Sequence, residues 1–307
     1  MHERDLLSSI QARSEAMLRP FAARVLIGPG DDCALLAHPA GQPIVVGVDQ
    51  LIVGRHCEPE TPIDLIARKA IARSVSDIGA MGATPTWALA AAKLPRGYAH
   101  ADELFEACAR WAAHWGCPLV GGDIATSPSE LALSITVAGD PHPTRGPVLR
   151  SGARPGDLVA VTGPIGDSFT SGWHLRFEPR VEQATRLCDE LGDALHAMID
   201  ISDGLGLDAD RVARASGVTI EIETESIPAR AGSTSTWRER VAHGEDYELL
   251  VTLAPQATPP EGLHVIGRVF SADAEGGARF RSPEGERVDA GTMGWDHGEP
   301  GDQAPAI

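Results

Sequence analysis

Apolar residues recur at helical spacing in several stretches of the chain. The longest such stretch opens at Pro62, a residue that suits the first turn of a helix, and continues to Met81, where Gly82 can end it. Further helices are expected over Glu3–Ala16 and Ala101–His114, after Asp167, after Arg180, and from near Gly206 to the Ser216–Gly217 pair.

Short runs of Val, Ile, Leu and Ala, bounded by Gly and Pro, predict strands between these helices. The strands are expected at Val25–Ile27, Cys33–Ala37, Pro43–Val48, Thr86–Ala92, Pro118–Val120, Leu131–Ala138, Leu158–Thr162, Met198–Ile199, Val218–Ile222, Tyr247–Leu253 and His264–Val269. The mixture predicts an α/β (α+β) fold. The stretch Asp140–Gly156 is rich in Pro, Gly and Arg. We therefore expect two α/β domains, over residues 1–145 and 146–307.

Charge and cysteine content narrow the function. The net charge is −17 and no run of Lys and Arg stands out, which argues against nucleic acid or an anionic membrane surface as a partner. The five cysteines are scattered without a CxxC pair, as in a protein with reduced thiols. Because no signal peptide and no membrane-length apolar run is apparent, we expect a cytoplasmic protein.

One pattern recurs along the chain: an apolar or helical segment ends, a small residue follows, and then an aspartate appears. Small residues let a ligand approach closely, and strand ends are where α/β folds keep their sites. Gathered carboxylates need cations between them, and magnesium prefers oxygen ligands. The alternative is that each aspartate forms a turn or caps a helix. The candidate metal ligands are Asp32, Asp49, Asp77, Asp123, Asp200 and Asp203.

Known phosphate-binding loops are missing from the sequence, since it contains no GxxxxGK[ST] and no GxGxxG after a strand. The Gly163–Ser168 segment follows a predicted strand, and its amides could hold an anion, although a plain strand-to-helix turn capped by Asp167 or Ser168 is the favoured interpretation of this segment alone. Arg150 lies in the boundary segment, either as a solvated surface charge or as a phosphate contact.

Taken in order, nine segments resemble bacterial thiamine-monophosphate kinases. They are residues 27–36 (IGPGDDCALL), 48–56 (VDQLIVGRH), 76–83 (SDIGAMGA), 121–123 (GGD), 149–157 (LRSGARPGD), 161–168 (VTGPIGDS), 199–205 (IDISDGL), 244–249 (GEDYEL) and 294–297 (GWDH). The resemblance implies two α/β domains and a homodimer formed through the N-terminal sheets. It also implies transfer of the γ-phosphate of ATP to thiamine monophosphate, with several Mg²⁺ ions between the two substrates.

Matching positions carry the family's site residues over to this chain. The six aspartates above look like metal ligands, together with Asp31 and with Val48 through its carbonyl. The ATP contacts would be Gly122, Asp123, Arg150 and Ser202, and the thiamine-phosphate contacts would be His56, Glu245 and Trp295. No covalent nucleophile is needed, since phosphoryl transfer asks mainly for positioning and electrostatic stabilisation. Individually, His56 is also explained by hydrogen bonding in a loop, Glu245 by a solvated turn and Trp295 by packing.

The chain departs from the family's pattern in several places. Gly47-Val48 stands where hydroxyl residues are common, Ser74 replaces a usual Asn, Ile124-Ala125 replaces a usual Thr pair, and the Thr224–Ala242 segment looks short. These departures leave two alternatives open. One is a sibling enzyme of the superfamily with another acceptor, although residues 1–30 lack the reactive Cys expected of selenophosphate synthetase, and the chain lacks the terminal Cys expected of the hydrogenase-maturation enzyme. The other is a non-catalytic nucleotide-binding relative.

Overall fold

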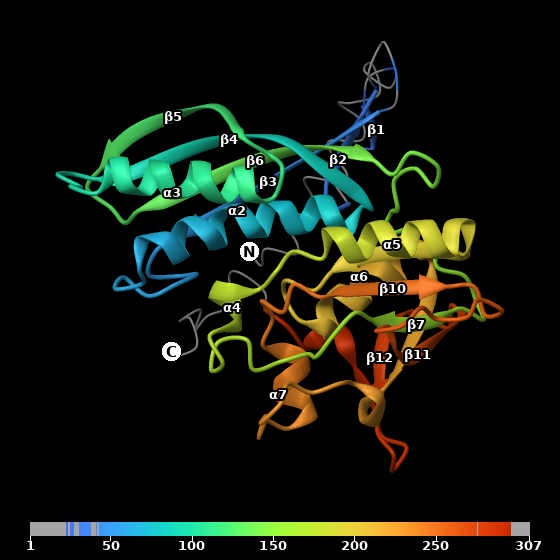
Figure 1. Ribbon diagram of the computed structural model, residues 1–307. Helices are drawn as coiled ribbons and strands as arrows, with labels where there is room; N and C mark the ends of the chain where they lie inside the picture. The colour runs from blue at the N-terminus through green and yellow to red at the C-terminus, as the bar shows by residue number, and fades with distance from the viewer. Residues whose placement is uncertain are drawn as a thin grey trace.

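The computed structural model describes residues 25–27, 31–37, 43–274 and 276–295, together with Ala23 and Gly41. The helix expected over Glu3–Ala16 lies outside these residues. Two β-sheets with helices packed on them build the described chain (Figure 1). The predicted α/β fold class is confirmed.

The first sheet is mostly antiparallel, with the strand order β1-β2-β3-β6-β4-β5 in the described chain, and β4 pairs with β5 in parallel. Helices α2 and α3 lie on one of its faces (Figure 1). The strands are β1 (Val25–Ile27), β2 (Ala34–Leu36), β3 (Ile44–Ile52), β4 (Ala83–Pro95), β5 (Leu119–Ser127) and β6 (Ala132–Pro141).

Helix α2 (Ile63–Ala80) packs between the two halves of the molecule. It contacts β3, β6 and α3 (Ala101–His114) on one side, and α4 (Trp173–Arg176), α5 (Val181–Leu191) and β8 (Leu195–Asp200) on the other. Pro62 precedes its first turn, and the chain leaves it at Gly82 in the left-handed region, with φ +65°. Because α2 is enclosed from several sides, even Lys69 on this helix is fully buried.

The second sheet has the order β13-β12-β9-β11-β7-β10-β8 in the described residues. Its apolar core includes Ile199, Ile220 and Phe280, all buried. The strands are β7 (Leu158–Val161), β8 (Leu195–Asp200), β9 (Val218–Glu223), β10 (Leu249–Leu253), β11 (His264–Ser271), β12 (Gly277–Arg281) and β13 (Arg287–Asp289). The helices are α4 (Trp173–Arg176), α5 (Val181–Leu191), α6 (Leu205–Ser216) and α7 (Trp237–Ala242), with 3-10 turns at Gly192–Ala194, Thr224–Ser226 and Ala290–Thr292.

Several expected element boundaries are wrong. Strands β3 and β5 run well beyond the predicted ends, so Asp49 and Asp123 lie within strands and not after them. Strand β10 begins at Leu249 and not at Tyr247, because Tyr247 has a positive φ of 51° that a strand does not admit. In the described part of the chain, no helix is long and apolar enough to cross a membrane.

Candidate functional site

Three of the predicted aspartates converge from distant parts of the sequence. Asp32 precedes β2, Asp77 lies in the last turn of α2, and Asp200 ends β8. Each offers a carboxylate oxygen, and these oxygens lie within 4.8 Å of one another. The Ser76 hydroxyl donates to Asp200 Oδ2 at 2.6 Å and fixes that carboxylate in the buried layer.

The carboxylates of Asp77 and Asp200 carry negative charge in a buried place. Burial raises the pKa of Asp77 well above its usual range, and the charges of Asp200, Asp49 and Asp32 raise it further. Burial and the charge of Asp32 likewise raise the pKa of Asp200 well above its usual range. A hard cation with oxygen ligands would relieve both effects, so this donor set fits Mg²⁺.

Arg150 is the cation that lies against the cluster. Its Nε and Nη2 donate to the two carboxylate oxygens of Asp32 at 2.9 and 2.7 Å. Its backbone N–H donates to Asp31 Oδ2 at 3.1 Å. Burial, followed by the charge of Asp32, raises the pKa of Asp31 to about 6. The boundary segment therefore contributes one guanidinium to a group of several acids.

A cavity of about 380 Å³ opens beside this cluster. It brings together most of the predicted site residues, namely Asp32, Val48, Asp49, His56, Asp77, Arg150, Ser202, Asp203, Glu245 and Trp295. It is also lined by residues that the sequence analysis missed, namely Arg55, Arg73, Phe169, Arg211, His243 and Tyr247. The cavity thus combines acidic, basic and aromatic side chains, which can contact the charged and the aromatic parts of a ligand.

The loop after β8 is held by two residues of α6. Asp208 Oδ2 accepts the backbone N–H groups of Ser202 and Asp203, each at 3.1 Å. Arg211 forms ion pairs with Asp203 at 2.7 Å and with Asp208 at 2.6 Å. Trp295 joins the same loop through its backbone N–H, which donates to the Asp203 carbonyl at 2.8 Å. Ser202, Asp203 and Trp295 are therefore fixed as one unit.

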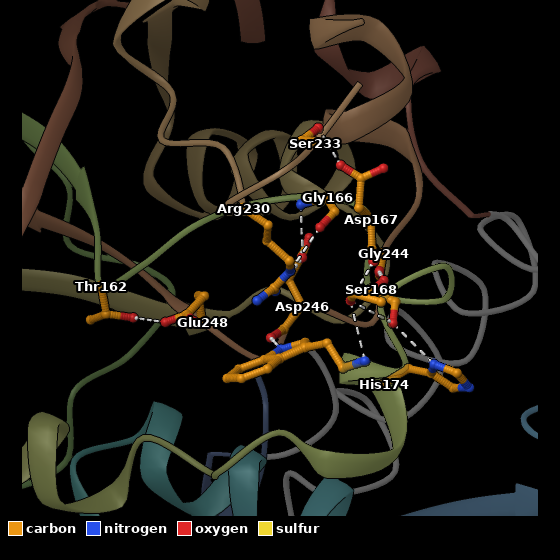
Figure 2. A network of polar contacts seen from close by, with 12 residues as sticks. Thr162, Gly166, Asp167, Ser168, His174, Arg230, Ser233, Gly244, Asp246 and Glu248 are labelled. Atoms are coloured by element: carbon orange, nitrogen blue, oxygen red, sulfur yellow. Dashed lines mark hydrogen bonds and ion pairs between the residues drawn. The ribbon is translucent and has the colours of Figure 1, made fainter. Parts of the chain in front are cut away.

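The segment Gly244–Glu248 adopts an unusual backbone. Glu245 and Tyr247 both have positive φ, at 57° and 51°, which is rare for residues other than glycine. Hydrogen bonds hold the segment in place: Gly166 N–H and Arg230 both donate to the buried Asp246 carboxylate, at 2.8 and 2.9 Å (Figure 2). This conformation places Glu245 at the cavity, so the segment is a rigid support and not the solvated turn that the sequence left open.

Four predicted residues do not line the cavity. Asp31 and Asp200 lie beside it, whereas Gly122 and Asp123 lie away from it. The pairing of the strands places Gly122 opposite Ala90, and Ala90 opposite Ile135, which in turn pairs with Asp49. Three strand spacings of about 4.8 Å separate the two rows, roughly 14 Å. Asp123, the next residue, lies on the other face of the sheet from Asp49 and is exposed. At Gly122 a Cβ would lie 1.9 Å from the Ala90 carbonyl oxygen, so packing alone requires glycine there.

Comparisons with known proteins identify the family of this chain. Residues 30–140 match the family model described as AIR synthase related protein, N-terminal domain. A thiamine-monophosphate kinase of Rhodopirellula baltica is 36% identical over 83% of each chain, and that of Escherichia coli K12 is 31% identical over 94% of this chain and 97% of its own. The solved structure described as AaThiL complexed with AMPPCP and TMP has a TM-score of 0.77 and 27% identity, covering 92% of this chain and 95% of its own. The chain belongs to the thiamine-monophosphate kinase family.

Proposed function

We propose that the protein catalyses the ATP-dependent phosphorylation of thiamine monophosphate to thiamine diphosphate. The observation that carries the proposal is the convergence of Asp32, Asp77 and Asp200 beside a cavity lined by Glu245 and Trp295, in a chain of this family. The relative solved with AMPPCP and TMP, which matches nearly the whole chain, supports the same pair of ligands.

The reaction needs little covalent chemistry from the protein. A bond forms between an oxygen of the acceptor phosphate and the γ-phosphorus of ATP, while the bond from that phosphorus to the β-phosphate oxygen breaks in line and ADP leaves. The acceptor phosphate is largely ionised at pH 7, since its second pKa is near ~6, so a general base is dispensable. The task of the protein is to hold two anions together.

Mg²⁺ ions would be held by Asp32, Asp77 and Asp200, with Asp31 and Asp203 beside them. When bound, these ions supply positive charge to the phosphate oxygens. Arg150 and Arg211 both line the cavity, and their guanidinium groups would contact phosphate beside the carboxylates they pair with. Ser202, on the loop fixed by Asp208, would contact ATP.

The acceptor would lie against the remaining wall of the cavity. Trp295 offers a ring for stacking on an aromatic heterocycle, and Arg55 lies 5.8 Å above that ring. Glu245 and His56 also line the cavity and would contact the acceptor beside Trp295. The N-terminal domain, residues 1–145, would thus contribute most of the metal ligands and the C-terminal domain, residues 146–307, most of the substrate contacts.

A homodimer through the face of the first sheet opposite α2 and α3 is part of the proposal. Val48 and Leu89 lie on that face in one row across β3, β6 and β4, and are 65% and 38% exposed. Apolar side chains in such a row on an open sheet are expected to be covered by a partner. Asp123 lies on the same face, so it would act at the interface and not inside the cavity of one chain.

The test is an assay of the purified protein with ATP, Mg²⁺ and thiamine monophosphate, in which thiamine diphosphate is followed by chromatography. We expect product from the wild type and from Asp102→Asn, an exposed control on α3, and at least a hundredfold less from Asp77→Asn. Nucleotide binding without product formation would refute the kinase proposal and favour a non-catalytic relative.

A further inference from the structure

Asp49 is paired with an arginine of helix α2. Arg73, one turn before Asp77 on α2, donates from Nε to Asp49 Oδ2 at 2.6 Å and from Nη2 to Asp49 Oδ1 at 3.1 Å. Both oxygens of Asp49 are therefore engaged by one guanidinium in a two-pronged contact, the geometry that makes Arg–carboxylate pairs strong.

The same guanidinium reaches a second carboxylate. Arg73 Nη1 lies 3.6 Å from Glu245 Oε1, and the other oxygen of Glu245 forms an ion pair with Lys69. The side chains of this quartet are shielded, with exposed fractions of 0% for Lys69, 12% for Arg73 and Glu245, and 28% for Asp49. We call these four residues the Arg73 quartet.

The charges of the Arg73 quartet balance, since it contains two acids and two bases. The neighbouring cluster differs: Asp32, Asp77 and Asp200 face the single guanidinium of Arg150. Asp32 is paired with Arg150, but Asp77 and Asp200 beside it remain in excess. A divalent cation gains most where negative charge is in excess and gains little in a group whose charges already balance. The balance of charge therefore directs metal to the cluster and away from Asp49.

Anchoring also distinguishes the two arginines. Arg150 extends from the irregular segment between β6 and β7, whereas Arg73 extends from α2, which is clamped between the two halves of the molecule. Lys69, Arg73 and Asp77 follow one another at four-residue spacing, which places them along one face of that helix. Without the guanidinium of Arg73 beside them, the poorly solvated carboxylates of Asp49 and Glu245 would lose a compensating charge, which would destabilise the fold.

We propose that Arg73 is a built-in cation that takes the place of a metal ion at Asp49, so that divalent cations bind at the Asp32, Asp77 and Asp200 cluster and not at Asp49. The inference rests on the proposed function, because it assigns which acids of that site hold metal. It also gives a physical role to Gly47-Val48: with Arg73 in place, hydroxyl ligands beside Asp49 are not needed.

The experiment is equilibrium binding of Mn²⁺ to the full chain, with free Mn²⁺ measured by electron paramagnetic resonance. We expect Asp49→Asn to keep the stoichiometry of the wild type and its affinity within twofold, whereas Asp77→Asn loses at least tenfold in affinity. We expect Arg73→Met to bind an additional Mn²⁺ per chain, and the Arg73→Met, Asp49→Asn double variant to lose that gain. Arg73→Lys, which keeps the charge, should show no additional ion.

Two results would overturn the inference. One is a loss of Mn²⁺ on Asp49→Asn comparable to that on Asp77→Asn, and the other is an Arg73→Met variant that binds no more Mn²⁺ than the wild type. If Arg73→Met does not fold, the Asp49→Asn arm decides by itself. Failure of the proposed function looks different: the wild type would form no thiamine diphosphate, while Mn²⁺ binding to the wild type and its variants would still follow the pattern above.

Discussion

Replacing Asp77 by Asn should stabilise the metal-free protein while it removes activity. The carboxylate oxygens of Asp77, Asp32 and Asp200 lie within 4.8 Å of one another. At that separation and an effective dielectric constant of about 20, two unit charges repel by about 3.5 kcal/mol. Proton sharing among the acids and the guanidinium of Arg150 relieve part of this repulsion, so we expect a net gain on the order of 1–3 kcal/mol in the free energy of unfolding.

The assay is urea unfolding at pH 8 in EDTA, followed by circular dichroism. Asp102→Asn on α3 removes one exposed negative charge and serves as the matched control, with an expected change within about 0.5 kcal/mol. Adding Mg²⁺ should stabilise the wild type and leave Asp77→Asn nearly unchanged, because the variant has lost a ligand.

A destabilisation of Asp77→Asn in EDTA would refute this reasoning. It would mean that the Asp77 carboxylate has a stabilising partner strong enough to outweigh its two acidic neighbours. The cluster would then be a structural network, and its excess of negative charge could no longer support a metal site.

Two further predictions concern the wall of the cavity. Burial raises the pKa of Asp246 to about 7, against an ordinary value of 3.8. As the pH rises, the unfolded chain therefore loses this proton before the folded chain does, so the free energy of unfolding falls from pH 4 to 7 and levels off above. In urea unfolding, Asp246→Asn should reduce that slope by at most about 1.4 kcal/mol per pH unit. An unchanged slope would show that Asp246 titrates normally. Trp295→Ala should raise the KM for thiamine monophosphate at least tenfold and change kcat by less than threefold. Phe105 is an exposed residue of α3, and Phe105→Ala should change neither constant. Equal KM values for the two variants would show that Trp295 is not part of the acceptor site.

The sequence was informative where local rules decide the structure. The start of α2 after Pro62 and its end before Gly82 follow from proline and glycine preferences, and the observed helix Ile63–Ala80 agrees within a residue. Strand ends were harder, because β3 and β5 continue through Asp49 and Asp123 as long as a neighbouring strand is there to pair with them. Pairing partners are set by topology, which no local pattern contains.

The residues of the cavity likewise divide into those that local sequence motifs predict and those that only the folded topology brings together. The ordered motifs predicted Asp32, Asp77 and Asp200, which converge. They also included Asp123, although two intervening strands and the plane of the sheet separate it from Asp49. Phe169, Arg211 and His243 were missed because only the packing of the two halves brings them to the cavity. Arg73 did leave a signal: it stands four residues from both Lys69 and Asp77 on a predicted helix, so all three share a face.

That shared face explains how one helix serves two electrostatic purposes. Lys69 and Arg73 balance Glu245 and Asp49, and this pairing lets α2 pass between the two halves of the molecule without a net buried charge on that side. One turn later Asp77 meets Asp32 and Asp200, where Arg150 alone opposes three acids. The helix thus runs from the Arg73 quartet, where the charges balance, to the Asp77 cluster, where negative charge is in excess. Cations are therefore expected to bind where Asp77 lies, and the position of α2 between the sheets determines that place.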